Sequence, residues 1–213
     1  DWAFYLLSQL CVITAFYYTW LLSKKILKNK ILSLISIMLL EGIFFYNFTT
    51  PEFNVNVCQL PFWSATTYYA WSCYSKGKMK NWILLGLSMS LGFLSKYIFV
   101  LLIISIKIFF LYEIFKKNKI YFNYFVPILI FTIILIPHIF WLIDNNFVSV
   151  LYAFKRSGLD ENHLINHLLN PLVFLMKQLI LLIPFMIMVI ILTNFKNINF
   201  KIKDKKLFFL FLT

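Results

Sequence analysis

Residues 81–115 read NWILLGLSMSLGFLSKYIFVLLIISIKIFFLYEIF, and this stretch decides the fold. It is too long for one ordinary membrane span, since about 20 apolar residues cross the roughly 30 Å of hydrocarbon in a bilayer. The run is interrupted near its middle by Ser95-Lys96-Tyr97. The sequence therefore predicts two apolar helices, at residues 82–94 and 97–115, that form a hairpin with Lys96 at its tip.

The composition of the whole chain is also that of a membrane protein. Of its 213 residues, 62% are hydrophobic and 13% are charged. The net charge of +12 would suit a nucleic-acid-binding protein if the lysines lay on one soluble face, but they gather in short clusters between apolar runs. We therefore expect no nucleic-acid partner.

Apolar runs that approach membrane-spanning length recur along the chain. They predict an all-α, polytopic membrane helix bundle of about eight membrane helices, including the short hairpin, in a single transmembrane domain over residues 1–213. Because the chain begins with Asp1 instead of methionine and ends inside an apolar run, we expect a fragment that is truncated at both ends. The predicted spans are residues 2–22, 31–48, 55–74, 82–94, 97–115, 121–143 and 171–193, with an incomplete span at 207–213.

The distribution of lysines predicts the orientation of this bundle. Four lysine clusters separate the spans, whereas residues 49–54 and 144–170 hold only Lys155 and Arg156 as basic residues. The positive-inside rule then places the lysine clusters in the cytoplasm and residues 144–170 in an outward-facing loop. The two clusters that flank residues 81–115 then lie on the same, cytoplasmic side. The chain between them must therefore enter the membrane and return, as a hairpin does. The clusters are residues 24–30, 76–80, 116–119 and 196–206.

Lys96 therefore reaches the outer side of the membrane, at the end of an arm only about 20 Å long. A lysine in this position is costly to leave unpaired, and its ammonium can neutralise a phosphate as a point charge. Its alternative role is to extend toward the membrane surface without binding anything.

Small and charged residues inside the spans predict how the helices pack. Gly86 with Ser90, and Ser88 with Gly92, would let the rising arm of the hairpin approach a neighbouring helix closely. Glu41 and Lys107 lie near the middle of spans, where a charge costs about 3 kcal/mol, and the simplest account pairs them with each other. These are structural expectations without a chemical role.

The outward-facing loop contains further polar residues. Its apolar residues at positions 147, 150, 151 and 154 predict an amphipathic helix with Arg156 on the polar side, either an interfacial helix or a linker along the membrane. His163 and His167 have a spacing that can hold a metal, but no carboxylate lies at a ligand-like distance, so no metal site is predicted. His138 follows a helix-kinking proline and either points inward or is satisfied locally.

An ordered set of motifs over residues 1–160 resembles a known family. They are Pro51-Glu52-Phe53-Asn54-Val55-Asn56, Leu60-Pro61-Phe62-Trp63, Gly86 through Leu94-Ser95-Lys96-Tyr97, and Pro137-His138-Ile139-Phe140-Trp141-Leu142. Together these motifs are similar to the GT-C membrane glycosyltransferases. Within that fold they resemble the group of protein mannosyltransferases and aminoarabinose transferases, including the glycosyltransferase RgtA/B/C/D-like domains of bacteria.

The resemblance implies an enzyme in a bacterial cell (inner) membrane. Such an enzyme transfers a sugar from a polyprenyl-phosphate donor to a lipid, glycan or protein acceptor at the outer, periplasmic face, with inversion. The resemblance places the catalytic carboxylates in an outward loop before Asp1, so the general base is unknown here. No cofactor is implied with certainty, and a need for a divalent metal stays open.

Chemistry of this kind needs cationic or amide groups to stabilise the departing lipid phosphate. Lys96 suits this role, and the polar residues of the outer turn could orient a substrate, although Glu52 is equally explained as a turn residue. The candidate substrate-binding residues are Lys96, Tyr97, Glu52, Asn54, Asn56, Arg156 and His138.

A lipid-linked oligosaccharide transporter, a flippase or another polytopic carrier is the rival hypothesis. Transporters place their sites near the bilayer centre between internal repeats. Here the polar residues gather at the outer ends of spans, and no repeat is apparent. The sequence therefore favours the enzyme.

Overall fold

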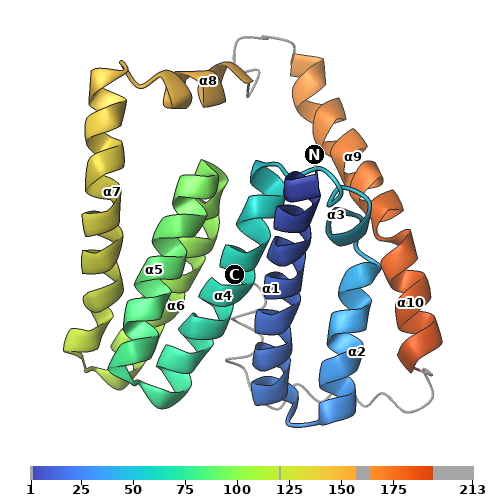
Figure 1. Ribbon diagram of the computed structural model, residues 1–213, viewed down its shortest axis with the longest axis horizontal. Helices are drawn as coiled ribbons and strands as arrows, with labels where there is room; N and C mark the ends of the chain where they lie inside the picture. Colours follow the sequence, from blue (N-terminus) through green and yellow to red (C-terminus); the bar gives the residue numbers. More distant parts are fainter. Residues whose placement is uncertain (1, 120, 157–163, 194–213) are drawn as a thin grey trace.

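The computed structural model describes residues 2–119, 121–156 and 164–193, which are all-α. The long helices stand roughly side by side, and α8 lies across one end of the bundle (Figure 1). The helices are α1 (Trp2–Leu27), α2 (Lys30–Glu41), α3 (Phe44–Asn47), α4 (Val55–Lys76), α5 (Met79–Ser95), η1 (Tyr97–Phe99), α6 (Val100–Lys117), η2 (Phe122–Tyr124), α7 (Val126–Asp144), α8 (Val148–Arg156), α9 (Leu164–Leu181) and α10 (Ile183–Thr193).

Helices α5 and α6 form the hairpin that the sequence predicts. α5 ends at Ser95, Lys96 has an extended backbone, and the 3-10 turn η1 leads into α6. The Lys96 backbone N–H donates to the Gly92 carbonyl at 3.2 Å, and its own carbonyl accepts from the Phe99 N–H at 3.0 Å. Lys96 is therefore the single extended residue between two helical segments.

The predicted number of about eight membrane helices is wrong. In the described residues, four helical segments are long and apolar enough to cross a membrane. The run at 31–48 is broken at Gly42 into α2 and the one-turn α3, and α5 has only 17 residues. The predicted partial span at 207–213 lies outside the described residues. The four segments are Trp2–Leu27, Tyr97–Lys117, Phe122–Asp144 and Leu169–Leu192.

Small residues allow α5 to approach its neighbours, as predicted. A Cβ added to Gly86 would lie 2.9 Å from the Ile130 Cβ and 3.0 Å from the Pro127 Cα, both in α7. A Cβ on Gly92 would overlap the ring of Phe99. Ser88 and Ser90 are buried. α5 therefore packs closely against both α4 and α7.

We expect Gly86→Ala to destabilise the protein by about 1–3 kcal/mol, because the added methyl group must displace the α7 backbone at Pro127. Thermal unfolding of the purified variant in detergent measures this loss. Leu87→Phe, which adds bulk at the adjacent exposed position, is the control and should unfold near the wild-type temperature. Equal unfolding temperatures for Gly86→Ala and the wild type would show that α5 and α7 are not in close contact.

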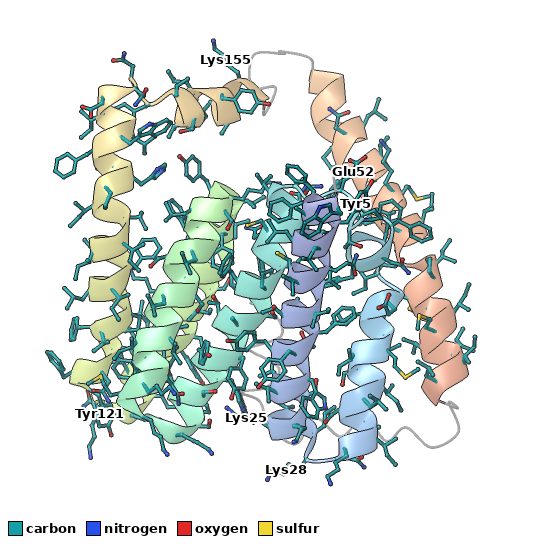
Figure 2. The ribbon with its side chains drawn as sticks, in the orientation of Figure 1. Tyr5, Lys25, Lys28, Glu52, Tyr121 and Lys155 are labelled. Carbon is teal, nitrogen blue, oxygen red and sulfur yellow. The ribbon has the colours of Figure 1, made fainter. Side chains whose placement is uncertain are left out.

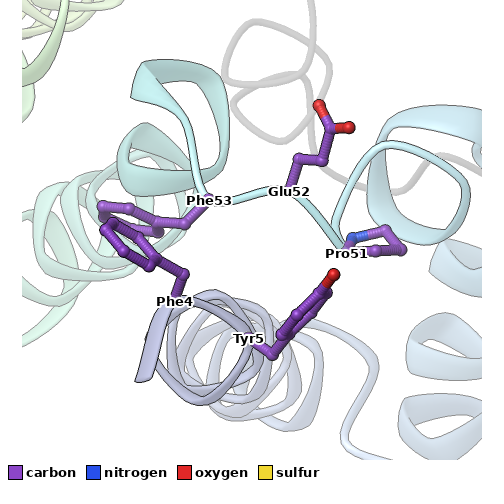
Figure 3. A pocket seen from close by; sticks show the side chains of 5 residues that line it. All are labelled: Phe4, Tyr5, Pro51, Glu52 and Phe53. Atoms are coloured by element: carbon purple, nitrogen blue, oxygen red, sulfur yellow. The ribbon is translucent and has the colours of Figure 1, made fainter. Parts of the chain in front are cut away.

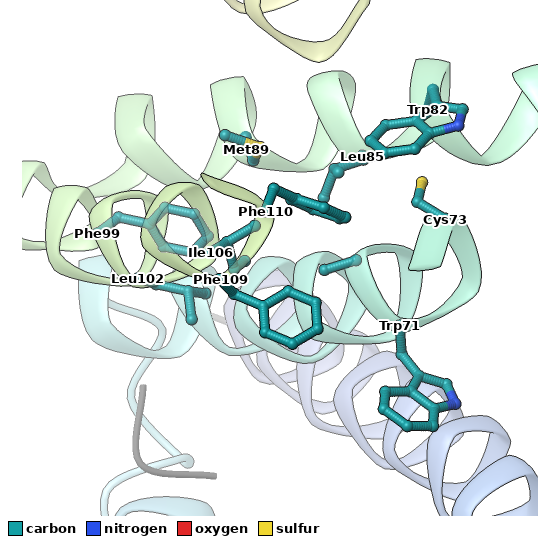
Figure 4. Close-up of a cluster of buried hydrophobic side chains, with 11 residues drawn as sticks. Trp71, Cys73, Trp82, Leu85, Met89, Phe99, Leu102, Ile106, Phe109 and Phe110 are labelled. Carbon is teal, nitrogen blue, oxygen red and sulfur yellow. The ribbon is translucent and has the colours of Figure 1, made fainter. Parts of the chain in front are cut away.

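Bulky apolar side chains form the buried core next to α5. The core lies between α4, α5 and α6, where aromatic and aliphatic side chains interlock (Figure 4). Trp63 meets Phe99 edge-on at 5.3 Å between ring centroids, which anchors the start of α6 against α4. The buried cluster consists of Ala70, Trp71, Cys73, Trp82, Leu85, Met89, Phe99, Leu102, Ile106, Phe109 and Phe110.

The predicted ion pair between Glu41 and Lys107 does not form. Both residues are exposed, on α2 and α6 respectively. Within the described ranges, the ion pair joins Glu113 and Lys117 instead, at 3.2 Å, one turn apart on α6. The Glu113 side chain is only 1% exposed, and its oxygens accept no hydrogen bond besides this ion pair. The Lys117 ammonium therefore balances the charge of the buried carboxylate.

The lysines at the end of α1 mark one end of the bundle. Lys25 and Lys28 lie at the end opposite to Tyr5, Glu52 and Lys155 (Figure 2). Lys25 belongs to α1 and not to a loop, and its ammonium donates to the Ser72 hydroxyl of α4 at 2.5 Å. We refer to these two ends as the lysine-rich end and the Glu52 end.

Candidate functional site

The turn before α4 determines how the site is built. The Asn54 side-chain oxygen accepts hydrogen bonds from the backbone N–H groups of Asn56 and Val57, at 2.9 and 3.3 Å. Asn54 is therefore the N-cap of α4, a role typical of asparagine. Its own amide donates to the Glu52 carbonyl at 3.2 Å. The structure thus gives Asn54 a structural role, since this cap positions the first turn of α4 with Asn56, and its substrate-binding role stays a prediction.

Replacing Asn54 tests which role it has. We expect Asn54→Ala to lower the unfolding free energy by about 1 kcal/mol through loss of the cap, and Asn54→Ser to retain most of it. Thermal unfolding of both variants gives the comparison. An equal loss of stability in the alanine and serine variants would argue against capping.

Lys96 lies in a pocket of about 400 Å³ at the Glu52 end of α4. Its ammonium donates to the Asn56 side-chain oxygen at 2.6 Å, and the buried Gln59 amide donates to the Lys96 carbonyl at 3.5 Å. The structure thereby joins two of the predicted site residues, which are 40 positions apart in sequence. The pocket is lined by Thr49, Asn56, Val57, Gln59, Leu60, Trp63 and Lys96.

The charge of Lys96 is not neutralised within the described chain. None of the described carboxylates lies within ion-pair distance of its ammonium, and its partner Asn56 is a neutral amide. A neutral acceptor orients the ammonium but leaves its full positive charge available. A pocket with an oriented cation and amide donors is suited to bind an anion such as a phosphate.

Tyr97, the residue after Lys96, forms a second polar cluster. Its hydroxyl lies 2.9 Å from the His138 Nε2 of α7 and 3.0 Å from the Ser149 hydroxyl of α8. The His138 ring in turn stacks on Trp141 at 5.8 Å between centroids. His138 therefore points toward the hairpin tip, one of the two possibilities that the sequence left open.

Glu52 lies apart from the Lys96 pocket. It lines a separate hollow of about 250 Å³ between the start of α1 and the turn before α4, together with Phe4, Tyr5, Pro51 and Phe53. In Figure 3 the Glu52 carboxylate points away from the rings of Phe4 and Tyr5. The structure thus places Glu52 near the site without bringing it to Lys96.

The remaining predicted site residue, Arg156, is the last residue of α8. Sequence analysis did not find Gln59, Trp63 or Ser149. The first two could have been found, because Asn56, Gln59 and Trp63 are spaced by three and seven residues and share one face of α4. Ser149 carries no such signal, since its contact depends on how α8 lies across the bundle.

Within the described ranges, no group of three or more His, Cys, Asp and Glu side chains could hold a metal ion. The polar groups that the site offers are instead an ammonium, amides, hydroxyls and the imidazole of His138. These groups bind and orient anions or sugars and do not by themselves supply a strong base.

Comparison with known proteins agrees with the motifs. Residues 1–141 match the family model of dolichyl-phosphate-mannose-protein mannosyltransferase. A relative from Wigglesworthia glossinidia brevipalpis, named undecaprenyl phosphate-alpha-4-amino-4-deoxy-L-arabinose arabinosyl transferase, is 42% identical over 98 residues, which cover 42% of this chain and 17% of that protein. No solved structure matches the chain significantly.

The matched range contains the hairpin, the Lys96 pocket and His138, and ends at Trp141. The family match thus covers most of the residues that form the site, and the resemblance found from the sequence motifs is confirmed. The chain belongs to the dolichyl-phosphate-mannose-protein mannosyltransferase family of glycosyltransferases.

Proposed function

We propose that this protein transfers a sugar from a polyprenyl-phosphate carrier to a lipid, glycan or protein acceptor at the outer face of a bacterial cell membrane. The observation that carries the proposal is the Lys96 ammonium, held by a neutral amide in an open pocket at the tip of the hairpin. Such a pocket suits the phosphate of the donor. The name of the bacterial relative, which contains undecaprenyl phosphate, supports this class of donor.

The reaction explains why a cation is needed there. A hydroxyl of the acceptor attacks the anomeric carbon of the sugar, the bond from that carbon to the phosphate oxygen breaks, and the configuration inverts. The leaving phosphate gains negative charge as its bond breaks, while the acceptor proton passes to a general base. A preorganised ammonium beside the leaving group lowers the barrier because it binds this charge most strongly in the transition state.

The proposed orientation follows from the two ends of the bundle. The lysine-rich end lies in the cytoplasm, residues 1–213 form one membrane domain, and residues 144–170 face outward. Helix α8 supports this arrangement, since it lies across the Glu52 end and exposes large apolar side chains (Figure 1). It has the character of a helix that lies in the membrane interface. The exposed apolar residues there include Phe147, Val148, Leu151 and Tyr152.

Reconstituted vesicles provide the test of this function. The protein is incorporated into liposomes that contain undecaprenyl-phosphate-linked sugars and a membrane extract as the source of acceptors, and the loss of sugar from the carrier is measured by mass spectrometry. We expect release of undecaprenyl phosphate and gain of the sugar mass on an acceptor. Vesicles without the protein are the control.

Two outcomes would overturn the proposal. One is that every donor stays intact in the presence of folded protein. The other is that the donors cross the bilayer unaltered, as a transporter would cause, which a membrane-impermeant glycosidase added outside would detect.

A further inference from the structure

We propose that Tyr97 is a positioning residue, whose hydroxyl is held between His138 and Ser149 so that Lys96 meets the donor phosphate in a fixed place. This inference rests on the proposed function and adds to it a role for α7 and α8. It assigns to Tyr97, His138 and Ser149 no direct contact with the reacting atoms.

The Tyr97 hydroxyl has one partner for its proton and a second partner for its oxygen. A phenol hydroxyl has one proton to donate and can accept in return. With His138 Nε2 at 2.9 Å and the Ser149 hydroxyl at 3.0 Å, it can donate to one partner and accept from the other. Three elements, η1, α7 and α8, therefore meet at a single oxygen atom.

The Tyr97 ring is held as firmly as its hydroxyl. It packs against Phe93 of α5 at 5.3 Å and against His138 at 5.9 Å between ring centroids. His138 is itself stacked on Trp141, with an interplanar angle of 12°. Since the half-buried ring packs against α5 on one side and α7 on the other, these contacts favour one location for its hydroxyl.

The backbone of Lys96 is bonded to Gly92 and Phe99, and Tyr97 adds a side-chain anchor at the next residue. Lys96 is extended, η1 has no side-chain cap, and the only side-chain donor to the Lys96 carbonyl is Gln59 at a long 3.5 Å within the described residues. A fixed Tyr97 therefore restricts the direction in which the Lys96 side chain leaves the tip. An ammonium that is already in place needs no reorganisation during the reaction.

Ser149 connects this arrangement to the turn between α7 and α8. Asn146 and Phe147 both have left-handed backbones, with φ of 51° and 55°, a conformation that asparagine tolerates and that is unfavourable for phenylalanine. The neighbouring contact from Ser149 to Tyr97 helps to hold the turn in this conformation. The position of α8 and the position of Lys96 are thereby coupled.

The test compares variants in the vesicle assay for sugar transfer. Tyr97→Phe keeps the ring packing and removes only the hydroxyl, and we expect kcat to fall roughly tenfold with little change in the donor KM. His138→Ala should have a similar effect. His138→Gln should recover most of the rate, because the glutamine amide can bond to the hydroxyl in the place of Nε2. Tyr121→Phe, at the lysine-rich end, is the matched control and should keep the wild-type rate.

A merely structural role would give a different result. Tyr97→Phe would then lower the unfolding temperature while each folded molecule kept its kcat, and glutamine at position 138 would be no better than alanine. Either finding overturns the inference. If wild-type protein transfers sugar, Lys96→Met does not, and Tyr97→Phe is fully active, this inference fails while the proposed function stands. If wild-type protein transfers no sugar, the proposed function itself fails.

Discussion

Lys96→Met is expected to lower the rate of sugar transfer by about 10²–10³-fold, the loss typical when one preorganised donor to a developing anion is removed. Methionine retains much of the length and apolar character of the lysine stem and removes the ammonium. The Asn56 oxygen then loses its donor, but the pocket keeps its shape. Initial rates of donor consumption in vesicles, measured at equal amounts of folded protein, give the ratio.

Two further variants separate charge from packing. Lys96→Arg keeps the positive charge in a larger, planar group and should retain part of the activity. Lys107→Met removes an exposed lysine of α6 that has no role in the site, and it should leave the rate unchanged. If Lys96→Met transferred sugar as fast as the wild type, Lys96 would serve only to reach the membrane surface.

Lys117→Met is expected to destabilise the protein by about 3 kcal/mol, because it leaves the buried Glu113 carboxylate without compensation. Removing one partner of a fully buried ion pair costs about 3–5 kcal/mol of stability. Because the Lys117 side chain is 45% exposed, we expect a loss at the lower limit of this range. Chemical or thermal unfolding in detergent measures the loss.

The double variant Glu113→Leu with Lys117→Met provides the control for this pair. It removes both charges and fills the space with apolar groups, so it should recover most of the lost stability. If Lys117→Met alone unfolds at the wild-type temperature, Glu113 does not depend on this lysine. Sugar transfer per folded molecule should be the same in all of these variants, since the pair lies apart from the Lys96 pocket.

Local pattern was enough to predict the hairpin. The interruption at Lys96 and the small residues Gly86 and Gly92 act within one or two helical turns, so their effect on the backbone can be read from the sequence. The family was equally accessible, because its motifs are short and ordered. The structure joins Lys96 with Asn56 and Tyr97 with His138 by hydrogen bonds, and the substrate-binding role of these four residues stays a prediction.

The errors arose where the outcome depends on three-dimensional packing. A count of apolar runs treated residues 31–48 as one span, although the helix ends before Gly42. There α10 packs so closely that a Cβ added to Gly42 would lie 2.8 Å from its atoms. The pairing of Glu41 with Lys107 assumed that two charges in spans must meet. The structure exposes both and buries Glu113 instead, next to a lysine on its own helix.

Photo-crosslinking with undecaprenyl phosphate that carries a reactive group beside the phosphate tests the central claim most directly. The claim is that the Lys96 pocket holds the phosphate of the lipid carrier. We expect adducts on the peptide that contains Asn56, Gln59 and Trp63, with a yield that falls in Lys96→Met and is unchanged in Lys107→Met. Adducts confined to the lysine-rich end, or an equal yield in Lys96→Met, would contradict the claim.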